Sequence, residues 1–257
     1  MKNVEKYETQ VKDFLAVCRL LGKRVYVTSH GGNLSYRLEE DLLLITPTRV
    51  YKGNLKADDL VFIDLAGNII EGSLKPSGET PMYLNFFKER PDINSVIHCH
   101  PPVTNAFAIT KGRNWLMRPI FPETVVEVGP VPVVPYGEPL TQRLADNFKP
   151  YLQKYNAFLM ESHGLVIMSS GDIVRAFELT DILETSAVSI LQALAVGEIK
   201  EISKEDVKNL ENTMKTRHLP MIGNPALKND LLSLYFSKNT QGGEGPLNSG
   251  DVALDPT

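Results

Sequence analysis

The stretch RPDINSVIHCHP, residues 90–101, places two of the chain's five histidines one residue apart at the end of an apolar run. Side chains two residues apart in a β-strand point to the same face of the sheet. A strand over residues 95–100 would therefore set the imidazoles of His98 and His100 side by side, with Cys99 facing the opposite way into the core. The stretch predicts either a pair of metal ligands or two histidines satisfied by hydrogen bonds at a strand end.

A third histidine favours the interpretation of His98 and His100 as metal ligands. His163 interrupts a second strongly apolar run, residues 157–168, which we expect to form one strand. Three histidines from two strands can bind Zn²⁺ and leave one position open for a substrate, as catalytic zinc sites do. The sequence thus predicts one zinc ion per chain, held by His98, His100 and His163. The remaining two histidines, His30 and His218, are expected to be dispensable for the metal.

The sequence KPSGET, residues 75–80, contains the candidate general base, Glu79. Ser77 is typical of a helix N-cap, so we expect a helix to begin there and to end at Pro91. A carboxylate in a first helical turn has a simple structural explanation, because it complements the helix dipole. This helix leads directly into the histidine strand, however, and that connection would bring Glu79 near the metal.

Three polar loops are candidates for holding an anion. They are GGNLS at residues 31–35, TPT at residues 46–48, and Ser77-Gly78. Glycines expose backbone N–H groups, and a helix N-terminus attracts phosphate. Each loop taken alone is more often an ordinary turn. Only their convergence on one point would distinguish an anion site from three turns.

The rest of the chain predicts one α/β domain with a mostly antiparallel sheet. Apolar residues at three- and four-residue steps indicate helices, and short apolar runs between turn residues indicate strands. We expect helices over residues 3–23, 140–151, 172–195 and 205–218, strands over 25–28, 33–37, 42–45, 61–64 and 69–70, and irregular or edge β over 125–134. From Ser237 the chain is rich in Gly, Ser, Asn and Pro, which predicts a domain over residues 1–236 and a flexible tail over 237–257.

Composition narrows the function classes. The 257 residues carry 27 basic and 31 acidic side chains, and this mild acidity argues against a nucleic-acid groove, which needs a basic face. No apolar run approaches the ~20 residues that span a bilayer, so no membrane partner is expected. The first residues lack the apolar core of a secretory signal, and two cysteines cannot form a disulfide framework. We therefore expect a cytoplasmic protein.

Several of these motifs occur together in a known order. GNLSYR (32–37), ITPT (45–48), KPSGE (75–79), RPDINSVIHCHP (90–101) and SHG (162–164) resemble the class II aldolase/adducin family. Within this family, the motifs most resemble those of the zinc-dependent sugar-phosphate aldolases, such as L-fuculose-1-phosphate aldolase. The resemblance extends from about residue 10 to 195. The resemblance implies a three-layer α/β/α sandwich around a largely antiparallel sheet. It also implies a homotetramer with active sites at subunit contacts.

The resemblance assigns roles to individual residues. His98, His100 and His163 match the zinc ligands, and Glu79 matches the catalytic acid/base, which in the family also ligates the resting metal. The matches to substrate-phosphate contacts are Gly32, Asn33, Thr48, Ser77 and Gly78.

Two positions in these loops depart from the family pattern. Arg49 stands where the family has a glycine, and Gly78 stands where it has a second serine. Arg49 either replaces the lost hydroxyl as a charged donor or points to solvent. The family's tyrosine acid, supplied by a neighbouring subunit, has no clear counterpart. Phe121 falls near one such position, and Tyr235 is a candidate for a C-terminal one.

By this resemblance the expected reaction is reversible cleavage of a ketose 1-phosphate into dihydroxyacetone phosphate and a small aldehyde. Rival enzymes of the family share the same site. A pentulose-phosphate 4-epimerase commonly has Asp at the position of Glu79, which argues against it, whereas a dehydratase or a decarboxylase keeps Glu. An adducin-like binding module without catalysis lacks the full metal set, and all three histidines are present here.

Overall fold

A single eight-stranded sheet runs through the middle of the molecule, in the order β4-β3-β2-β1-β5-β8-β7-β6. The computed structural model describes residues 1–237. The strands are β1 Asn33–Glu39, β2 Leu42–Ile45, β3 Val61–Ile63, β4 Ile69–Glu71, β5 Ser95–Cys99, β6 Val133–Val134, β7 Ala157–Met160 and β8 Gly164–Ser169. Neighbouring strands are antiparallel except β6 and β7, which are parallel, so the predicted, largely antiparallel sheet is confirmed.

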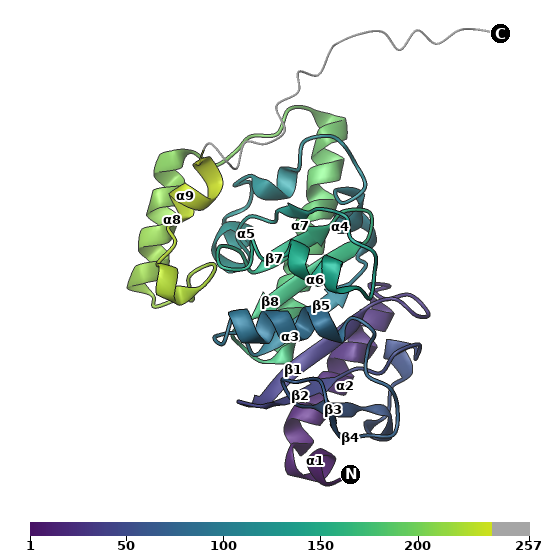
Figure 1. Ribbon diagram of the computed structural model, residues 1–257. Helices are drawn as coiled ribbons and strands as arrows, with labels where there is room; N and C mark the ends of the chain where they lie inside the picture. The colour runs from purple at the N-terminus through teal and green to yellow at the C-terminus, as the bar shows by residue number, and fades with distance from the viewer. Residues whose placement is uncertain (238–257) are drawn as a thin grey trace, which may run out of the picture.

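Helices cover both faces of the sheet and make a three-layer α/β/α sandwich (Figure 1). Alternate residues of β2 enter two different buried clusters: Leu42 and Leu44 pack in the first, and Leu43 and Ile45 in the second. The helices are α1 Lys2–Lys6, α2 Glu8–Lys23, α3 Thr80–Glu89, α4 Pro102–Ala106, α5 Pro122–Glu127, α6 Gln142–Asn147, α7 Ile173–Val196, α8 Lys204–Thr216 and α9 Leu231–Phe236, with 3₁₀ turns at Lys52–Asn54, Ala57–Asp59, Trp115–Met117 and Pro225–Leu227. The expected fold class is confirmed.

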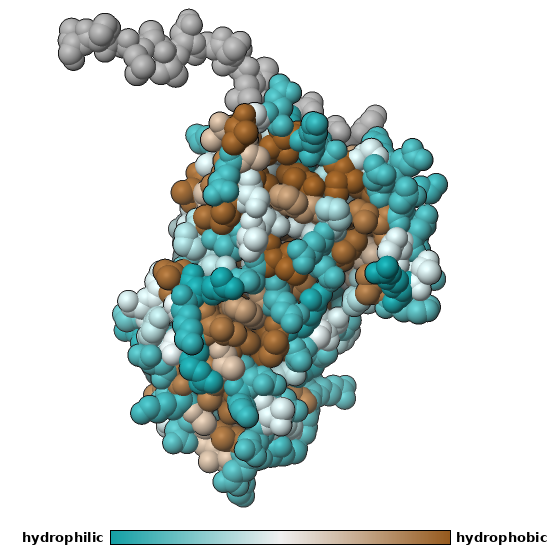
Figure 2. All heavy atoms as spheres, turned by 180° about the vertical axis from the view of Figure 1, so that it is seen from behind, coloured by the Kyte–Doolittle hydropathy of each residue, from teal (hydrophilic) through white to brown (hydrophobic). Residues whose placement is uncertain are grey.

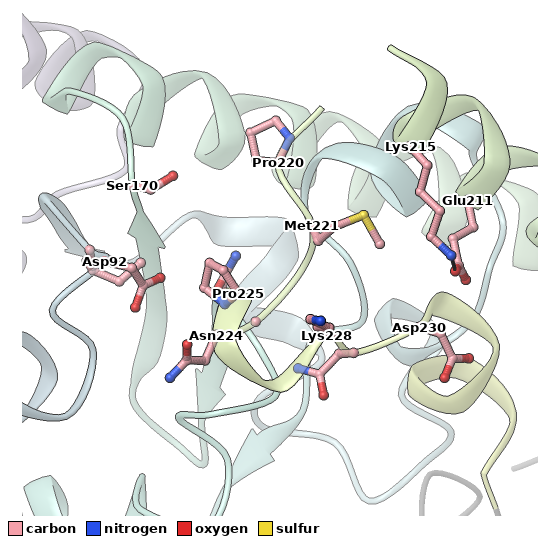
Figure 3. A pocket seen from close by; sticks show the side chains of 14 residues that line it. Asp92, Ser170, Glu211, Lys215, Pro220, Met221, Asn224, Pro225, Lys228 and Asp230 are labelled. Atoms are coloured by element: carbon pink, nitrogen blue, oxygen red, sulfur yellow. Dashed lines mark hydrogen bonds and ion pairs between the residues drawn. The ribbon is translucent and has the colours of Figure 1, made fainter. Parts of the chain in front are cut away.

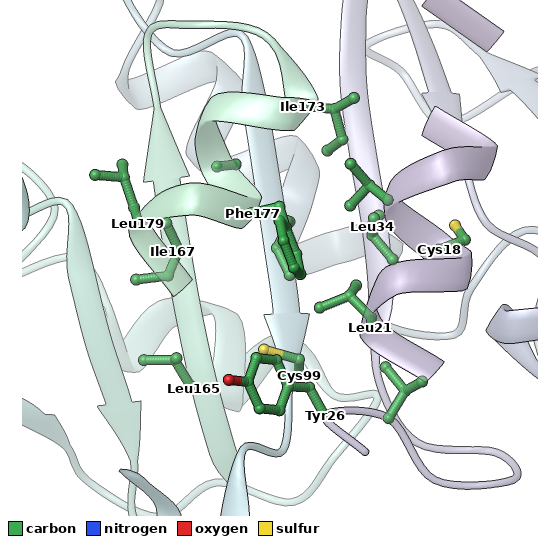
Figure 4. Packing of buried hydrophobic residues seen from close by; sticks show 14 of the residues in the cluster. Cys18, Leu21, Tyr26, Leu34, Cys99, Leu165, Ile167, Ile173, Phe177 and Leu179 are labelled. Carbon is green, nitrogen blue, oxygen red and sulfur yellow. The ribbon is translucent and has the colours of Figure 1, made fainter. Parts of the chain in front are cut away.

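Helices α2 and α7 pack side by side on the first face of the sheet (Figure 4). Cys18 and Leu21 of α2, Phe177 of α7 and Cys99 of β5 belong to one buried cluster, in which Leu21 lies between α2 and Phe177. Cys99 therefore faces the core, opposite to His98, as the strand alternation predicts. On the second face, α3 and α6 cover the sheet, and residues of α8 and α9 join their cluster.

Two predicted strands differ from the structure. The run over residues 157–168 is a hairpin of β7 and β8, not one strand, because Ser162 takes the left-handed backbone conformation and reverses the chain. The polar interruption in this run is thus the turn itself. Residues 25–28 form no strand: Val25 has a φ of 60°, and the Tyr26 carbonyl accepts a hydrogen bond from the His100 backbone N–H at 2.6 Å.

The helix predictions are right in kind and wrong at several ends. The N-terminal helix is interrupted at Tyr7, and α6 is shorter than predicted. Helix α3 begins at Thr80 rather than at Ser77, because residues 77–80 first form a hydrogen-bonded turn. The segment 125–134, expected to be irregular or edge β, begins inside α5, which starts with Pro122 at a position where proline is well tolerated, and ends in the edge strand β6.

Helix α7, on the first face of the sheet, carries several exposed apolar residues. Its length and composition would suffice to cross a membrane, but a core helix passes the same test, and one side of α7 is buried against the sheet. Near its C-terminal end Leu191, Leu194 and Val196 are exposed. Figure 2 shows apolar side chains gathered on the upper part of this side of the molecule. The predicted tail lies outside the described residues, apart from Ser237.

Candidate metal centre and substrate pocket

Three histidines meet at one end of the central strands. His98 lies in β5, His100 follows that strand, and His163 lies in the turn between β7 and β8. Their available ring nitrogens all lie within 4.8 Å of one another, and the Nε2 atoms of His98 and His100 are 3.1 Å apart. The antiparallel pairing of β5 with β8 brings the turn residue to the end of the histidine strand. The structure thus brings together the three predicted ligands.

The surroundings set the protonation of these rings. Nδ1 of His98 lies 2.9 Å from the Leu165 carbonyl oxygen, so this nitrogen carries the proton and donates a hydrogen bond to the carbonyl. The lone pair is then on Nε2, which faces the other rings. Burial lowers the pKa of His98, His100 and His163 to about 4. All three imidazoles are therefore neutral near pH 7, and neutral imidazole is the form that binds a metal ion.

Gly164 makes the close approach of the histidines possible. A Cβ atom at this position would lie 2.6 Å from Cδ2 of His100 and 2.8 Å from Cε1 of His98. Such contacts are far shorter than van der Waals distance, and the Cys99 backbone carbonyl oxygen would lie only 2.8 Å away as well. The glycine after His163 is therefore required by the packing of the cluster.

Glu79 lies against the histidine cluster. Its side chain is 4% exposed, with Oε2 3.4 Å from Nε2 of His98 and Oε1 3.5 Å from Nε2 of His163. The Asn33 side chain donates a hydrogen bond of 2.7 Å to Oε2. The carboxylate makes no capping bond to α3, although Glu79 occupies the N-cap position. The helix dipole alone thus does not explain where this carboxylate points.

The donor set fits a divalent metal ion. Three neutral imidazoles and one carboxylate are ligands that Zn²⁺ accepts. Four buried side-chain polar atoms of the described residues lack a hydrogen-bond partner, and three of them belong to residues at this site. They are Oδ1 of Asn33, Nδ1 of His163 and Oδ1 of Asn105, whose Nδ2 lies 3.5 Å from the His163 carbonyl oxygen. Buried polar atoms are rarely left unpaired, so this gathering indicates a site built for a polar occupant.

The three polar loops converge on the same place. A cavity of about 190 Å³ is lined by the nine residues predicted for the site: Gly32, Asn33, Thr48, Ser77, Gly78, Glu79, His98, His100 and His163. A backbone bridge between Pro47 and Pro76 fastens the second loop to the third. The Ser77 hydroxyl accepts a hydrogen bond of 3.2 Å from the Glu79 backbone N–H. Their roles as phosphate contacts remain predictions.

The cavity also contains residues that the sequence reasoning did not select. Lys52, from the first 3₁₀ turn, lines it, and so do His30 at its exposed rim and Leu140. Lys52 stands four residues beyond the TPT loop in a polar segment, so no periodicity marks it as buried. Arg49 lines the cavity too and is exposed, with a φ of 57° that glycine adopts more easily.

The two candidates for a tyrosine-type acid lie elsewhere in this chain. Tyr235 is 2% exposed within α9, where it packs in the second buried cluster, and it does not line the cavity. Phe121 precedes α5 and packs against the first cluster. Neither residue joins the site within one chain.

A larger cavity, of about 490 Å³, lies at the opposite ends of β5 and β8 (Figure 3). Its charged side chains are largely occupied with one another. Lys215 forms an ion pair with Glu211, Asp92 pairs with the buried Arg90, and Asp230 caps α9. None of the buried unpaired polar atoms found in the described residues belongs to the lining of this cavity, which distinguishes it from the histidine site.

Comparison with known proteins points in the same direction. The family model of the class II aldolase and adducin N-terminal domain matches residues 12–191. A 3-oxo-tetronate 4-phosphate decarboxylase of Haemophilus influenzae is 31% identical over 195 residues, 75% of this chain and 91% of the relative. An L-fuculose phosphate aldolase of Methanococcus maripaludis is 34% identical over 175 residues, 68% of this chain and 92% of the relative. The crystal structure of Klebsiella pneumoniae YgbL, for which aldolase, epimerase and decarboxylase stand as alternatives, superposes with a TM-score of 0.73 at 32% identity, covering 79% of this chain and 98% of YgbL.

Proposed function

The chain belongs to the class II aldolase and adducin family, and we propose that it is a zinc-dependent aldolase that reversibly cleaves a ketose 1-phosphate into dihydroxyacetone phosphate and a small aldehyde. The observation that carries this proposal is the position of Glu79 against the three histidines. A carboxylate beside a metal site can move a proton at the carbon next to a carbonyl group. Aldolase relatives with 34% identity support the same reaction class.

In this proposal the residues of the site have separate chemical roles. A divalent ion held by the histidines would supply Lewis-acid polarisation of the substrate's carbonyl oxygen. Glu79 would return a proton to the carbon that loses the aldehyde in cleavage and would remove that proton in condensation. The Asn33 amide holds one oxygen of this carboxylate at 2.7 Å and so orients it. The loops at Gly32, Thr48 and Ser77 would bind the phosphate.

A decarboxylase of a 3-oxo acid phosphate is the second candidate. It is favoured by the Haemophilus influenzae relative, which shares 31% identity over 91% of its length. Loss of carbon dioxide also leaves a carbanion next to a carbonyl group, and Glu79 could protonate it in the same position. One site geometry therefore serves both reactions, and only the group that leaves distinguishes them.

The decisive experiment is a substrate panel with two readouts. Purified protein loaded with zinc is incubated with several ketose 1-phosphates and several 3-oxo acid phosphates, and the release of dihydroxyacetone phosphate and of carbon dioxide is followed. We expect dihydroxyacetone phosphate from at least one ketose 1-phosphate. Release of carbon dioxide alone would favour the decarboxylase over the aldolase. The absence of both products would exclude both candidates.

A second test concerns the phosphate contacts. The bond from one neutral donor to a phosphate is charge-assisted and is worth about 1.5–3 kcal/mol. Ser77→Ala should therefore weaken substrate binding about 10- to 100-fold and leave the metal content unchanged. Asn33→Ala should in addition lower turnover, because its amide holds Glu79. Unchanged binding in the Ser77 variant would remove that residue from the pocket's phosphate contacts.

We also propose a cytoplasmic homotetramer with active sites at the subunit contacts. Two features support an assembly. The exposed apolar side chains at the end of α7 would be covered by a second copy. The tyrosine acid of the family would come from that neighbouring copy, because neither Phe121 nor Tyr235 lines the cavity of its own chain.

A further inference from the structure

Lys52 is one of the largest fully buried side chains of the protein, with 2% of its surface exposed. It lies at the start of the 3₁₀ turn Lys52–Asn54, which packs against α2. Lysine is among the residue types least often found fully buried, and a buried lysine is normally paired with a carboxylate. This burial therefore needs an explanation from the surroundings.

The ammonium group has little to bind within the chain. Its Nζ donates one hydrogen bond, of 2.7 Å, to the Val50 carbonyl oxygen. Within the described residues no carboxylate oxygen lies within 4.0 Å of it. Since an ammonium group has three N–H donors, two of them lack an acceptor among residues 1–237. Burial lowers the pKa of Lys52, and the more distant Glu79 carboxylate opposes that shift.

The side chain lines the cavity that contains the histidine cluster. Thr48 and Ser77, the hydroxyl residues of two converging loops, line the same cavity. We propose that Lys52 is a specificity-determining residue that binds the phosphate group of the substrate as a buried cation. The proposal rests on the proposed function and adds to it the group that selects phosphorylated over unphosphorylated substrates.

This assignment accounts for the departures from the family pattern. A second hydroxyl is absent at Gly78, and Arg49 in the glycine position is exposed to solvent. A buried cation binds a phosphate more strongly than an exposed one, because water screens it less. Lys52 therefore replaces the lost hydroxyl more effectively than Arg49 does.

The test measures the binding of inorganic phosphate and of dihydroxyacetone phosphate to the zinc-loaded full chain by titration calorimetry. In Lys52→Met, which keeps an unbranched side chain and removes the charge, we expect the affinity for both probes to fall about 10- to 100-fold. Lys52→Arg should retain most of the affinity. The matched control is Lys56→Met, four residues away and exposed, which should bind both probes as the parent protein does.

Thermal unfolding separates a binding role from a structural one. Without phosphate, Lys52→Met should melt at the parent temperature or above it, because an unpaired buried charge destabilises the fold. Added phosphate should raise the melting temperature of the parent and of Lys56→Met, and should raise that of Lys52→Met much less at the same concentration. The inference is overturned if the parent does not bind phosphate, or if Lys52→Met binds it equally well. It is likewise overturned if Lys52→Met melts lower and still shows the parent's full response to phosphate. Lys52-dependent phosphate binding without turnover of any ketose 1-phosphate would instead sink the proposed function alone.

Discussion

At the scale of single residues, the candidate metal centre depends on a few short-range constraints. A carbonyl group orients His98, and the absence of a side chain at Gly164 admits two of the rings. The amide of Asn33 turns Glu79 toward the histidines. Each of these contacts predicts a separate effect of substitution.

Loss of a histidine should remove the metal. His98→Ala or His163→Ala deletes one of three imidazole ligands, and two ligands hold a divalent ion much more weakly than three. We expect metal content near zero per chain for both variants, measured by elemental analysis after gel filtration. His30→Ala and His218→Ala serve as controls and should retain the parent stoichiometry. Full metal content in both ligand variants would show that the ion binds elsewhere.

Replacement of the carboxylate should affect turnover rather than folding. Glu79→Gln keeps the size of the side chain and removes its ability to take up a proton. We expect kcat to fall about 10²- to 10⁴-fold, the usual worth of a positioned acid or base. Circular dichroism and most of the metal content should be unchanged. Near-parent activity in this variant would exclude Glu79 from the mechanism.

The histidine cluster also predicts how the stability of the metal-free protein depends on pH. The pKa of each histidine is about 4 in the folded chain and 6.5 in the unfolded chain, so the unfolded state binds more protons between these values. The free energy of unfolding should therefore fall as the pH is lowered from about 6.5 towards 4. The slope is at most about 1.4 kcal/mol per pH unit for each histidine.

Urea unfolding of chelator-treated protein at a series of pH values measures this slope. His163→Gln removes one of the three titrating groups and should make the slope shallower. A variant that removes no titrating group, Ser189→Ala at an exposed position of α7, is the control and should leave the slope unchanged. Equal slopes in the parent and in His163→Gln would contradict the assigned protonation.

At the scale of elements, the short helix α4 is held in place by a side chain from the long helix α7. Glu184 is 6% exposed, and its carboxylate accepts hydrogen bonds from the backbone N–H groups of Val103 and Thr104 and from the Thr104 hydroxyl. A carboxylate at the first turn of a helix satisfies N–H groups that have no partner within the helix. Helix α4 in turn carries Asn105 to the backbone of His163.

Glu184→Gln should therefore destabilise the protein. The amide places an N–H₂ group against backbone donors and loses the charge, which should cost about 2–3 kcal/mol of unfolding free energy. Urea denaturation monitored by circular dichroism gives this value. The control is Glu178→Gln on the exposed side of the same helix, where we expect a change below about 1 kcal/mol. Equal stability of the parent and Glu184→Gln would show that α4 does not depend on this contact.

At the scale of the whole molecule, the two sides of the sandwich differ in what they expose. The end of α7 presents Leu191, Leu194 and Val196, of which Val196 is 89% exposed. In the proposed tetramer a second copy covers these side chains. Leu194→Asp should then shift the molar mass, measured by light scattering after gel filtration, from the tetramer toward smaller species.

A matched substitution separates apolar contact from charge. Gln192→Glu adds a negative charge at an exposed neighbour on the same helix and removes no apolar side chain, so it should leave the mass unchanged. A monomeric parent protein would contradict the tetramer directly. A tetramer that survives Leu194→Asp would place its interface on another surface.

The sequence by itself determined the character of the fold and most of the site. Short apolar runs at 42–45 and 95–100 predicted strands, and the structure has strands there whose residues are buried on both faces of the sheet. The alternation of side chains along a strand paired His98 with His100 and sent Cys99 into the core. The motifs, together with their resemblance to a family, selected nine of the residues that line one cavity in the structure.

Only the tertiary structure decided what depends on contacts between distant segments. The turn at Ser162 requires a backbone conformation that sequence periodicity does not report, so one predicted strand is a hairpin that carries His163 to β5. The beginning of α3 depends on a turn fastened to the TPT loop, and not on Ser77 alone. Lys52 appears in the sequence as an ordinary polar loop residue. Its burial is decided by the packing of the 3₁₀ turn against α2, because exposure is a property of the surrounding elements and not of the residue type.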